Sequence, residues 1–131
     1  MKLVVDASVA VAATATPLGF ERLRAFELIA PPLLWIEAES VLHAMLWRGE
    51  VPADQAIEMR ARLRAAPIAP DGPRTLPDAS WALADEMGWA KTYDANYAAL
   101  ARLRSCRLVT LDARLRRGAH RLGFVVGPTE L

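Results

Sequence analysis

Two aspartates stand directly after short apolar segments near the two ends of the sequence. Asp6 follows the segment Leu3–Val5, and Asp112 follows the segment Leu108–Leu111. Both segments are typical of buried strands in a parallel sheet, and open α/β sheets bind ligands outside the carboxyl ends of such strands. Two carboxylates held there would repel each other, and a divalent cation would relieve that repulsion. In the alternative interpretation, each aspartate simply caps the helix after its strand.

Asp94 is a third candidate for the same site. It lies where Thr92 and Tyr93 give way to a predicted helix, so its side chain stands at the end of an element. The alternative interpretation is again that the side chain caps this helix. Tyr97 follows one turn later on nearly the same face, where it can support the carboxylate or pack in the core.

A predicted helix at 34–48 contains two further acids, which helical geometry separates. At about 100° per residue, one apolar sector forms on this helix. Glu37 falls at the edge of that sector and can reach an internal cleft. Glu39 points away from it, toward solvent or a partner. We therefore select Glu37 as the fourth candidate. The apolar sector contains Leu34, Ala38, Val41, Leu42 and Met45.

Other types of site find little support in the sequence. His43 and His120 have no second histidine at metal-ligand spacing, and we interpret both as residues of the surface or the substrate edge. Cys106 is the only cysteine, which excludes an intrachain disulfide and a cysteine-based metal cage. The chain has no glycine-rich phosphate loop and no Gly-x-Ser-x-Gly motif. A site made only of carboxylates selects Mg²⁺ or Mn²⁺ over zinc, because hard oxygen ligands suit hard cations.

The elements that must position these acids alternate between short apolar strands and helices. This alternation predicts an α/β fold, a three-layer α/β/α sandwich around a short parallel sheet. Strands are expected at 3–5, 68–69, 107–111 and 124–126. Helices are expected at 7–13, from Pro17 to Ile29, at 33–47, from Pro52 to before Pro67, from an N-cap at Asp78 to Met87, from Asp94 to Leu103, and briefly after Asp112.

Length and composition limit the class of protein. The 131 residues suit one domain, 1–131, and the net charge of +1 argues against a histone-like polycation and against an acidic disordered tail. Asp6 interrupts any signal-peptide apolar core, and no apolar run reaches the roughly 18 residues that cross a bilayer. We therefore expect a cytoplasmic protein without a membrane partner.

Four segments of the chain resemble the PIN-domain ribonucleases, and among them the VapC type, the toxin of a bacterial type II toxin–antitoxin pair. Each motif is weak by itself, whereas four acids in this order and local context are specific. The resemblance runs over nearly the whole chain, with no motif between Pro52 and Met87. The four segments are Val4–Ser8, Pro31–Glu37, Thr92–Ala101 and Leu108–Asp112.

The resemblance implies a PIN-like fold and an Mg²⁺-dependent endoribonuclease, with Mn²⁺ as another possible ion. Asp6, Asp94 and Asp112 would hold the metal, directly or through water, and Glu37 would be a further ligand or orient the attacking water. Hydrolysis of the RNA phosphodiester would leave a 5′-phosphate and a 3′-hydroxyl. Supporting roles fall to Ser8 and Thr110, the small polar residue after the first acid and the hydroxyl residue two before the fourth. Ser40 departs from the pattern, because many relatives carry asparagine there.

Arginines near the fourth acid are candidates for binding RNA phosphates. Arg114, Arg116 and Arg117 lie closest to Asp112 in the sequence, although any one arginine is more often part of a solvated helix face. The resemblance further implies a homodimer and a cognate antitoxin partner, and some tryptophans could face such a partner. Between 102 and 121 the arginines are Arg102, Arg104, Arg107, Arg114, Arg116, Arg117 and Arg121; the tryptophans are Trp35, Trp47, Trp81 and Trp89.

Other functions fit less well. A phospho-acceptor receiver domain needs a pair of acids just before Asp6, and a haloacid-dehalogenase-like phosphatase needs an aspartate where Ser8 stands. A non-catalytic PIN-like RNA-binding module would normally have lost one of the four acids. A housekeeping RNA-processing nuclease without an antitoxin stays open as an alternative.

Overall fold

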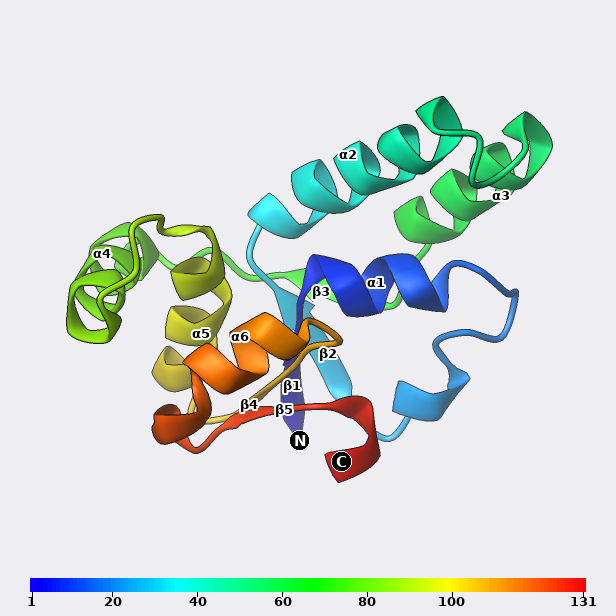
Figure 1. Ribbon diagram of the computed structural model, residues 1–131. Helices are drawn as coiled ribbons and strands as arrows, with labels where there is room; N and C mark the ends of the chain where they lie inside the picture. The colour runs from blue at the N-terminus through cyan, green and yellow to red at the C-terminus, as the bar shows by residue number, and fades with distance from the viewer.

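Five short strands form one parallel sheet in the order β3-β2-β1-β4-β5 (Figure 1), in a computed structural model that describes residues 1–131. The central strand β1 is buried on both faces, because Leu3, Val4 and Val5 are fully inaccessible. An apolar run of this kind has no polar side to turn toward solvent, which places it in the middle of a covered sheet. The strands are β1 (Lys2–Val5), β2 (Glu27–Ala30), β3 (Ile68–Pro70), β4 (Arg107–Val109) and β5 (Val125–Val126).

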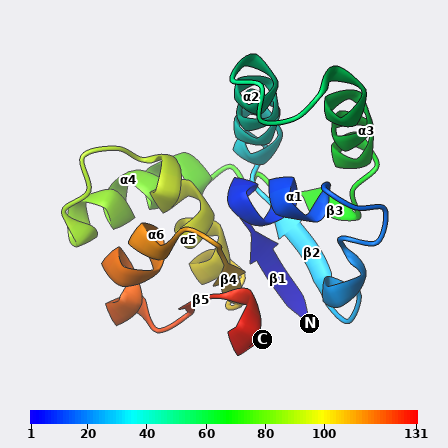
Figure 2. The ribbon, with the colours of Figure 1, turned by 45° about the vertical axis from the view of Figure 1, so that its right-hand side comes forward.

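Helices flank this sheet, so the molecule is the expected α/β sandwich. Helices α1, α2 and α3 pack together, α4 packs on α5, and α5 packs against β1 and β4. Figure 2 shows the α2–α3 hairpin at the end toward which β1 and β2 point. The helices are α1 (Ala7–Ala13), α2 (Leu33–Trp47), α3 (Ala53–Arg64), α4 (Leu76–Met87), α5 (Tyr93–Leu103) and α6 (Ala113–Gly118); 3₁₀ turns cover Glu21–Leu23, His120–Leu122 and Pro128–Glu130.

The segment between Pro17 and Ile29 is the main error of the sequence prediction. Instead of a helix it forms a 3₁₀ turn followed by strand β2. Periodicity cannot separate a short buried strand from a helix in such a run. The loop before it turns back on α1 at Gly19, where an added Cβ would lie 1.7 Å from the carbonyl oxygen of Ala13.

Two helices begin earlier than expected. Helix α4 begins at Leu76, so Asp78 lies in its first turn rather than at its N-cap. Helix α5 begins at Tyr93, which makes Asp94 its second residue. The other helices lie where the sequence pattern placed them: α1 has the predicted bounds, and α2 lies within one residue of them.

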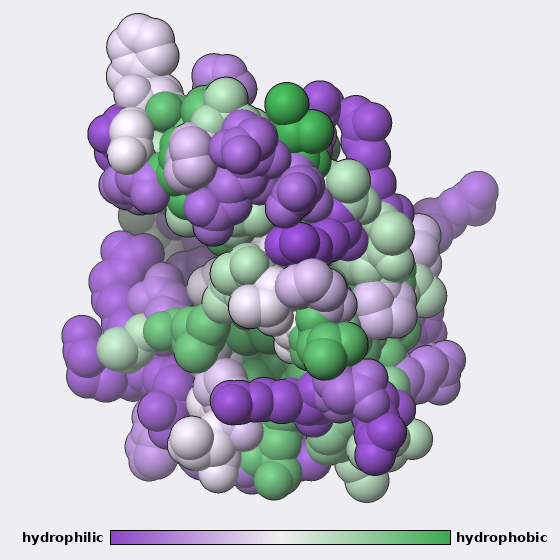
Figure 3. Space-filling model, turned by 90° about the vertical axis from the view of Figure 1, so that its right-hand side faces the viewer, coloured by the Kyte–Doolittle hydropathy of each residue, from purple (hydrophilic) through white to green (hydrophobic).

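The α2–α3 hairpin exposes several large apolar side chains. Ile36 and Ile57 are each 70% exposed, and Trp47 is 85% exposed. At the top of Figure 3, over this hairpin, apolar (green) and hydrophilic (purple) side chains alternate on the surface. None of the helices combines the length and the hydrophobicity that crossing a bilayer requires.

Candidate active site

The site is assembled where β1 and β4 end side by side. Val5 pairs with Val109 in the parallel ladder, which brings Asp6 and Thr110, the next residue of each chain segment, into contact. Asp6 is buried, and its carboxylate accepts hydrogen bonds from Ser8 Oγ at 2.6 Å, Thr110 Oγ1 at 2.5 Å and the Val9 amide at 3.1 Å. The amide bond makes Asp6 the N-cap of α1. Capping and a place in the site are therefore compatible roles.

Ser8 and Thr110 connect the two strand ends. Ser8 Oγ accepts a hydrogen bond from the Leu111 amide, and Thr110 Oγ1 accepts one from the Asp112 amide, both at 3.0 Å. Each hydroxyl thus donates to Asp6 and accepts from the segment that leads into α6. This hydrogen-bond network fixes the position of the Asp112 backbone relative to the Asp6 carboxylate.

Asp112 is the N-cap of α6. Its Oδ1 accepts hydrogen bonds from the amides of Arg114 and Leu115, while Oδ2 accepts none. Asp112 also affects the ionisation of Asp6. Burial raises the pKa of Asp6, and the negative charge of Asp112 raises it further. The three hydrogen bonds to the Asp6 carboxylate lower that pKa. A carboxylate whose ionised form is disfavoured by burial and by a neighbouring negative charge is stabilised by a bound cation.

Asp94 does not cap its helix. The N-cap of α5 is Thr92, and neither oxygen of the half-buried Asp94 carboxylate accepts a hydrogen bond from the protein. Burial raises the pKa of Asp94, the charge of Asp112 raises it further, and Arg114 lowers it. The carboxylate is therefore free for a ligand.

Glu37 and Glu39 point in different directions, as the helical rotation predicted, but Glu39 faces α3 instead of open solvent or a partner. Glu39 pairs with Arg60 of α3, where both side chains are partly exposed. Glu37 is half-buried and turns inward, where its Oε1 accepts a hydrogen bond of 2.6 Å from the hydroxyl of Tyr97. Burial of Tyr97, the bond to Glu37 and the nearby negative charges raise the pKa of that hydroxyl, which stays protonated.

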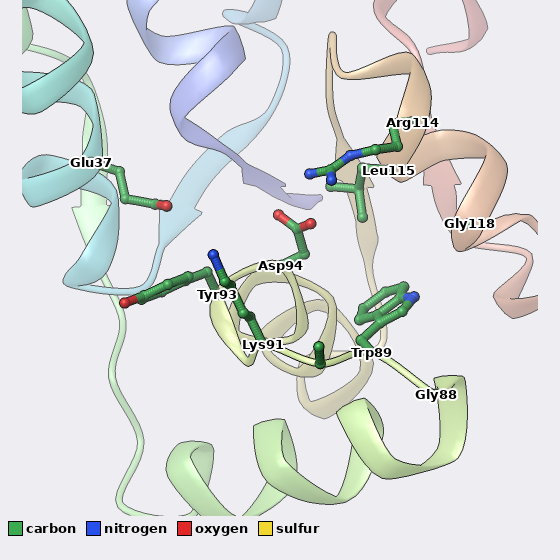
Figure 4. A pocket seen from close by; sticks show the side chains of 10 residues that line it. Glu37, Gly88, Trp89, Lys91, Tyr93, Asp94, Arg114, Leu115 and Gly118 are labelled. Atoms are coloured by element: carbon green, nitrogen blue, oxygen red, sulfur yellow. The ribbon is translucent and has the colours of Figure 1, made fainter. Parts of the chain in front are cut away.

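A pocket of about 570 Å³ lies between α2, the start of α5 and α6. In Figure 4, Glu37 and Arg114 reach toward Asp94 from opposite sides. Sequence reasoning missed the aromatic and basic side chains of the linker between α4 and α5, although a linker that leads into the first turn of α5, where Asp94 lies, must border the site. The lining residues are Glu37, Gly88, Trp89, Ala90, Lys91, Tyr93, Asp94, Arg114, Leu115 and Gly118.

The acids have the donor chemistry of a divalent-cation site but do not stand close enough together to complete one. No three histidine, cysteine, aspartate or glutamate side chains stand close enough together to form a complete metal site. The donor chemistry fits a hard cation, because every candidate donor is a carboxylate oxygen. Asp94 and Asp112 also keep oxygens without hydrogen-bond partners, and the charge of Asp112 acts on both Asp6 and Asp94.

The arginines divide into two groups. Arg114 lines the pocket, and Arg117 is exposed without an ion pair. Arg116 pairs with Glu130 instead of pointing into the pocket. The remaining arginines of the cluster are also engaged: Arg102 with Glu86, Arg104 with Asp71, Arg107 with the Glu130 carbonyl and the Phe26 ring, and Arg121 with the Glu86 carbonyl.

Residues 3–121 match the family model of the PIN domain. The chain belongs to the PIN domain family. PIN domains are typically nucleases and generally use divalent metal ions. The match runs from within β1 through α6 and includes all four candidate acids.

Solved structures share the fold of this PIN domain. The crystal structure of PAE2754 from Pyrobaculum aerophilum superposes with a TM-score of 0.73 and 24% identity, covering 99% of this chain and 94% of that one. A toxin–antitoxin complex from Klebsiella pneumoniae contains a chain with a TM-score of 0.66 and 18% identity, covering 96% and 97%. No curated protein sequence matches the chain.

Proposed function

We propose that this PIN domain is a Mg²⁺-dependent endoribonuclease, and that it is the toxin of a type II toxin–antitoxin pair of the VapC type. One observation carries the nuclease proposal. Asp6 and Asp112 follow β1 and β4 at the carboxyl end of the sheet, and Glu37 of α2 and Asp94 of α5 line the pocket. The charge of Asp112 acts on both Asp6 and Asp94. Carboxylates collected at this edge, with basic side chains on the rim, suit a polyanionic substrate that reacts beside a cation. We propose residues 1–131 as a single functional domain.

Asp6, Asp94 and Asp112 would hold the cation, with Mn²⁺ as a possible substitute. A bound divalent ion supplies charge neutralisation at the scissile phosphate and lowers the pKa of water. The protein prepares Asp6 for this role by burying it and by directing three hydrogen bonds at its carboxylate. Because Ser8 and Thr110 keep that group in one orientation, little rearrangement is needed on binding.

Glu37 and Arg114 would act on the substrate from the two sides of the pocket. Glu37 has one oxygen held by Tyr97, and its other oxygen can accept a proton or orient the attacking water. Arg114 faces Asp94, so its guanidinium can bind a phosphate next to the scissile bond (Figure 4). Lys91 lines the same pocket and offers a second positive charge.

Of the three arginines selected as RNA contacts, we retain Arg114 and Arg117 as the principal candidates. Arg114 lies at the pocket, and Arg117 is exposed on the same short helix. Arg116 can contribute only if its pair with Glu130 opens. An engaged guanidinium must lose one partner before it gains another, so its net contribution to RNA binding is smaller.

A protein partner is supported by the exposed apolar surface of the α2–α3 hairpin. Trp47 on α2 and Ile57 on α3 are mostly exposed, and Trp81 on α4 is 68% exposed. Exposed aromatic and aliphatic groups of this size are typical of interaction sites. The Klebsiella pneumoniae structure with the same fold is a toxin–antitoxin complex, which favours an antitoxin as the partner. We also propose that the chain forms a homodimer.

The decisive assay measures cleavage of structured RNA by the purified protein with Mg²⁺, with Mn²⁺ and with a chelator. The wild type should cleave only with the cation, and Asp94→Asn should lower the rate by about 100-fold or more, because a ligand is lost. Asp85→Asn is the matched control, since Asp85 is an exposed acid of α4 outside the site. Cleavage that ignores the chelator and survives both Asp6→Asn and Asp94→Asn would contradict the proposed site.

Expression in a bacterial host separates a toxin from a housekeeping nuclease. A toxin should arrest growth, and co-expression of the protein encoded by the adjacent reading frame should restore it. Cleavage in vitro without growth arrest would favour the housekeeping nuclease. RNA binding without cleavage would favour a non-catalytic module.

A further inference from the structure

We propose that Tyr97 is the positioning residue of Glu37: its hydroxyl holds one carboxylate oxygen of Glu37 and ties that side chain to the helix that carries Asp94. This inference rests on the proposed function, in which Glu37 acts beside Asp94. Tyr97 is 2% exposed, and its Oη lies 2.6 Å from Glu37 Oε1.

The bond joins two helices whose main packing partners differ. Helix α2, which carries Glu37, packs on α1 and α3, whereas α5 packs on α4, β1 and β4. The Tyr97–Glu37 bond is the one side-chain hydrogen bond between α2 and α5. Asp94 and Tyr97 are three residues apart on α5 and therefore share a face of that helix. One hydroxyl thus sets Glu37 relative to Asp94 across the pocket.

A neutral donor is suited to this task because it orients a carboxylate without cancelling its charge. Glu39, two residues further along α2, is instead neutralised by Arg60. Glu37 forms no ion pair, although Lys91 and Arg114 line the same pocket. Its negative charge therefore stays available to a cation or to the proton of an attacking water.

Packing alone does not explain a tyrosine at this position. The aromatic ring would fill the same volume in a phenylalanine, and a buried hydroxyl adds a desolvation cost unless it finds a partner. The partner of Tyr97 is a carboxylate of the site, 60 residues away in the sequence, rather than a backbone carbonyl of the core. The hydroxyl is therefore directed at the site.

A double-mutant cycle in steady-state kinetics tests this role with Tyr97→Phe, Glu37→Gln and the double variant. Tyr97→Phe should lower kcat by about tenfold or more and change KM by less than about threefold, because binding of RNA at the basic rim is untouched. In the Glu37→Gln background, the same substitution should change kcat by less than about twofold. Equal losses in both backgrounds, or an unchanged kcat, would overturn the proposal.

Thr14→Val is the matched control for removing a buried hydroxyl. Thr14 is fully buried and donates to the Val11 carbonyl at 2.6 Å, in α1 and away from the pocket. This variant should unfold at a lower temperature and keep the wild-type kcat. A kcat loss in Thr14→Val equal to that of Tyr97→Phe would show that general destabilisation explains both.

An NMR measurement tests the contact without any catalysis. The chain has two tyrosines, so ¹³C-tyrosine labelling gives two resolved Cζ resonances, those of Tyr93 and Tyr97. Glu37→Gln should shift the Tyr97 resonance and leave that of Tyr93 in place; an unmoved Tyr97 resonance would overturn the contact. If the wild type cleaves no RNA, the proposed function fails, whereas this shift still decides whether Tyr97 holds Glu37.

Discussion

The hydroxyl of Thr110 supports the most buried carboxylate of the site, and Thr110→Val removes that support while keeping the side-chain shape. Thr110 is fully buried and donates to Asp6 Oδ2 at 2.5 Å. A hydrogen bond to a charged group contributes about 1.5–3 kcal/mol, and the valine methyl recovers only part of this through apolar burial. We expect Thr110→Val to lower the free energy of unfolding by about 2 kcal/mol at pH 7.5. For a chain of this length, that is a fall in Tm of roughly 6–10 °C.

The penalty should depend on pH in a direction set by Asp6. The Thr110 bond lowers the pKa of Asp6, so its loss raises that pKa further above the ordinary value of 3.8. A carboxyl whose folded-state pKa is raised loses stability as pH rises through the interval between its unfolded and folded pKa values. Well below pH 3.8 Asp6 is protonated in both states, and the difference between Thr110→Val and the wild type should shrink.

Urea unfolding at pH 7.5 and at low pH measures both quantities. Thr110→Ser is the matched control, because it keeps the hydroxyl and loses one buried methyl, at a cost of about 1 kcal/mol with little pH dependence. The reasoning is refuted if Thr110→Val lies within about 0.5 kcal/mol of the wild type at pH 7.5. An equal penalty at both pH values would refute the assignment of the loss to ionised Asp6.

Three further predictions follow from single contacts. Asp94→Asn should raise Tm at pH 7 while removing activity, since burial and Asp112 raise the pKa of Asp94; calorimetry should show this gain vanishing below pH 3.8. Gly19→Ala should lower the free energy of unfolding by about 2 kcal/mol or more in urea, because its Cβ would meet the backbone of α1; wild-type stability would contradict the close approach. Arg114→Gln should raise KM for RNA about fivefold or more, whereas Arg102→Gln should not; equal effects would argue against Arg114 as a pocket contact.

Features set by neighbouring residues were predictable from the sequence. The apolar runs before Asp6 and Asp112 predicted two buried strands, and both aspartates do cap the helix that follows. The second strand ends at Val109, two residues before its predicted end, and Leu111 is exposed. The rotation of α2 likewise separated Glu37 from Glu39, because the angle between two helical residues is a local property. Asp94 was predicted as the N-cap of α5, two residues after the observed N-cap Thr92, since a helix start without a capping side chain leaves little local signal.

Features that depend on distant partners required the tertiary structure. Strand β2 forms because Leu28 pairs with Leu3 on one side and with Ile68 on the other. The residues from Pro17 to Ile29 carry no local signal from which this pairing could be predicted. The bond from Tyr97 to Glu37 has the same origin.

The arginines show the same difference between what the sequence determines and what the tertiary structure decides. Their number and their place after Asp112 are properties of the chain, and they led to an RNA-binding prediction for three of them. Whether a guanidinium is free to bind RNA depends on which acids of the folded chain lie next to it. Arg116 forms an ion pair with Glu130, whereas Arg114 lines the pocket with Asp94. Coulomb energy depends on distance in space rather than separation along the chain, so only folding selects which positive charges face the pocket.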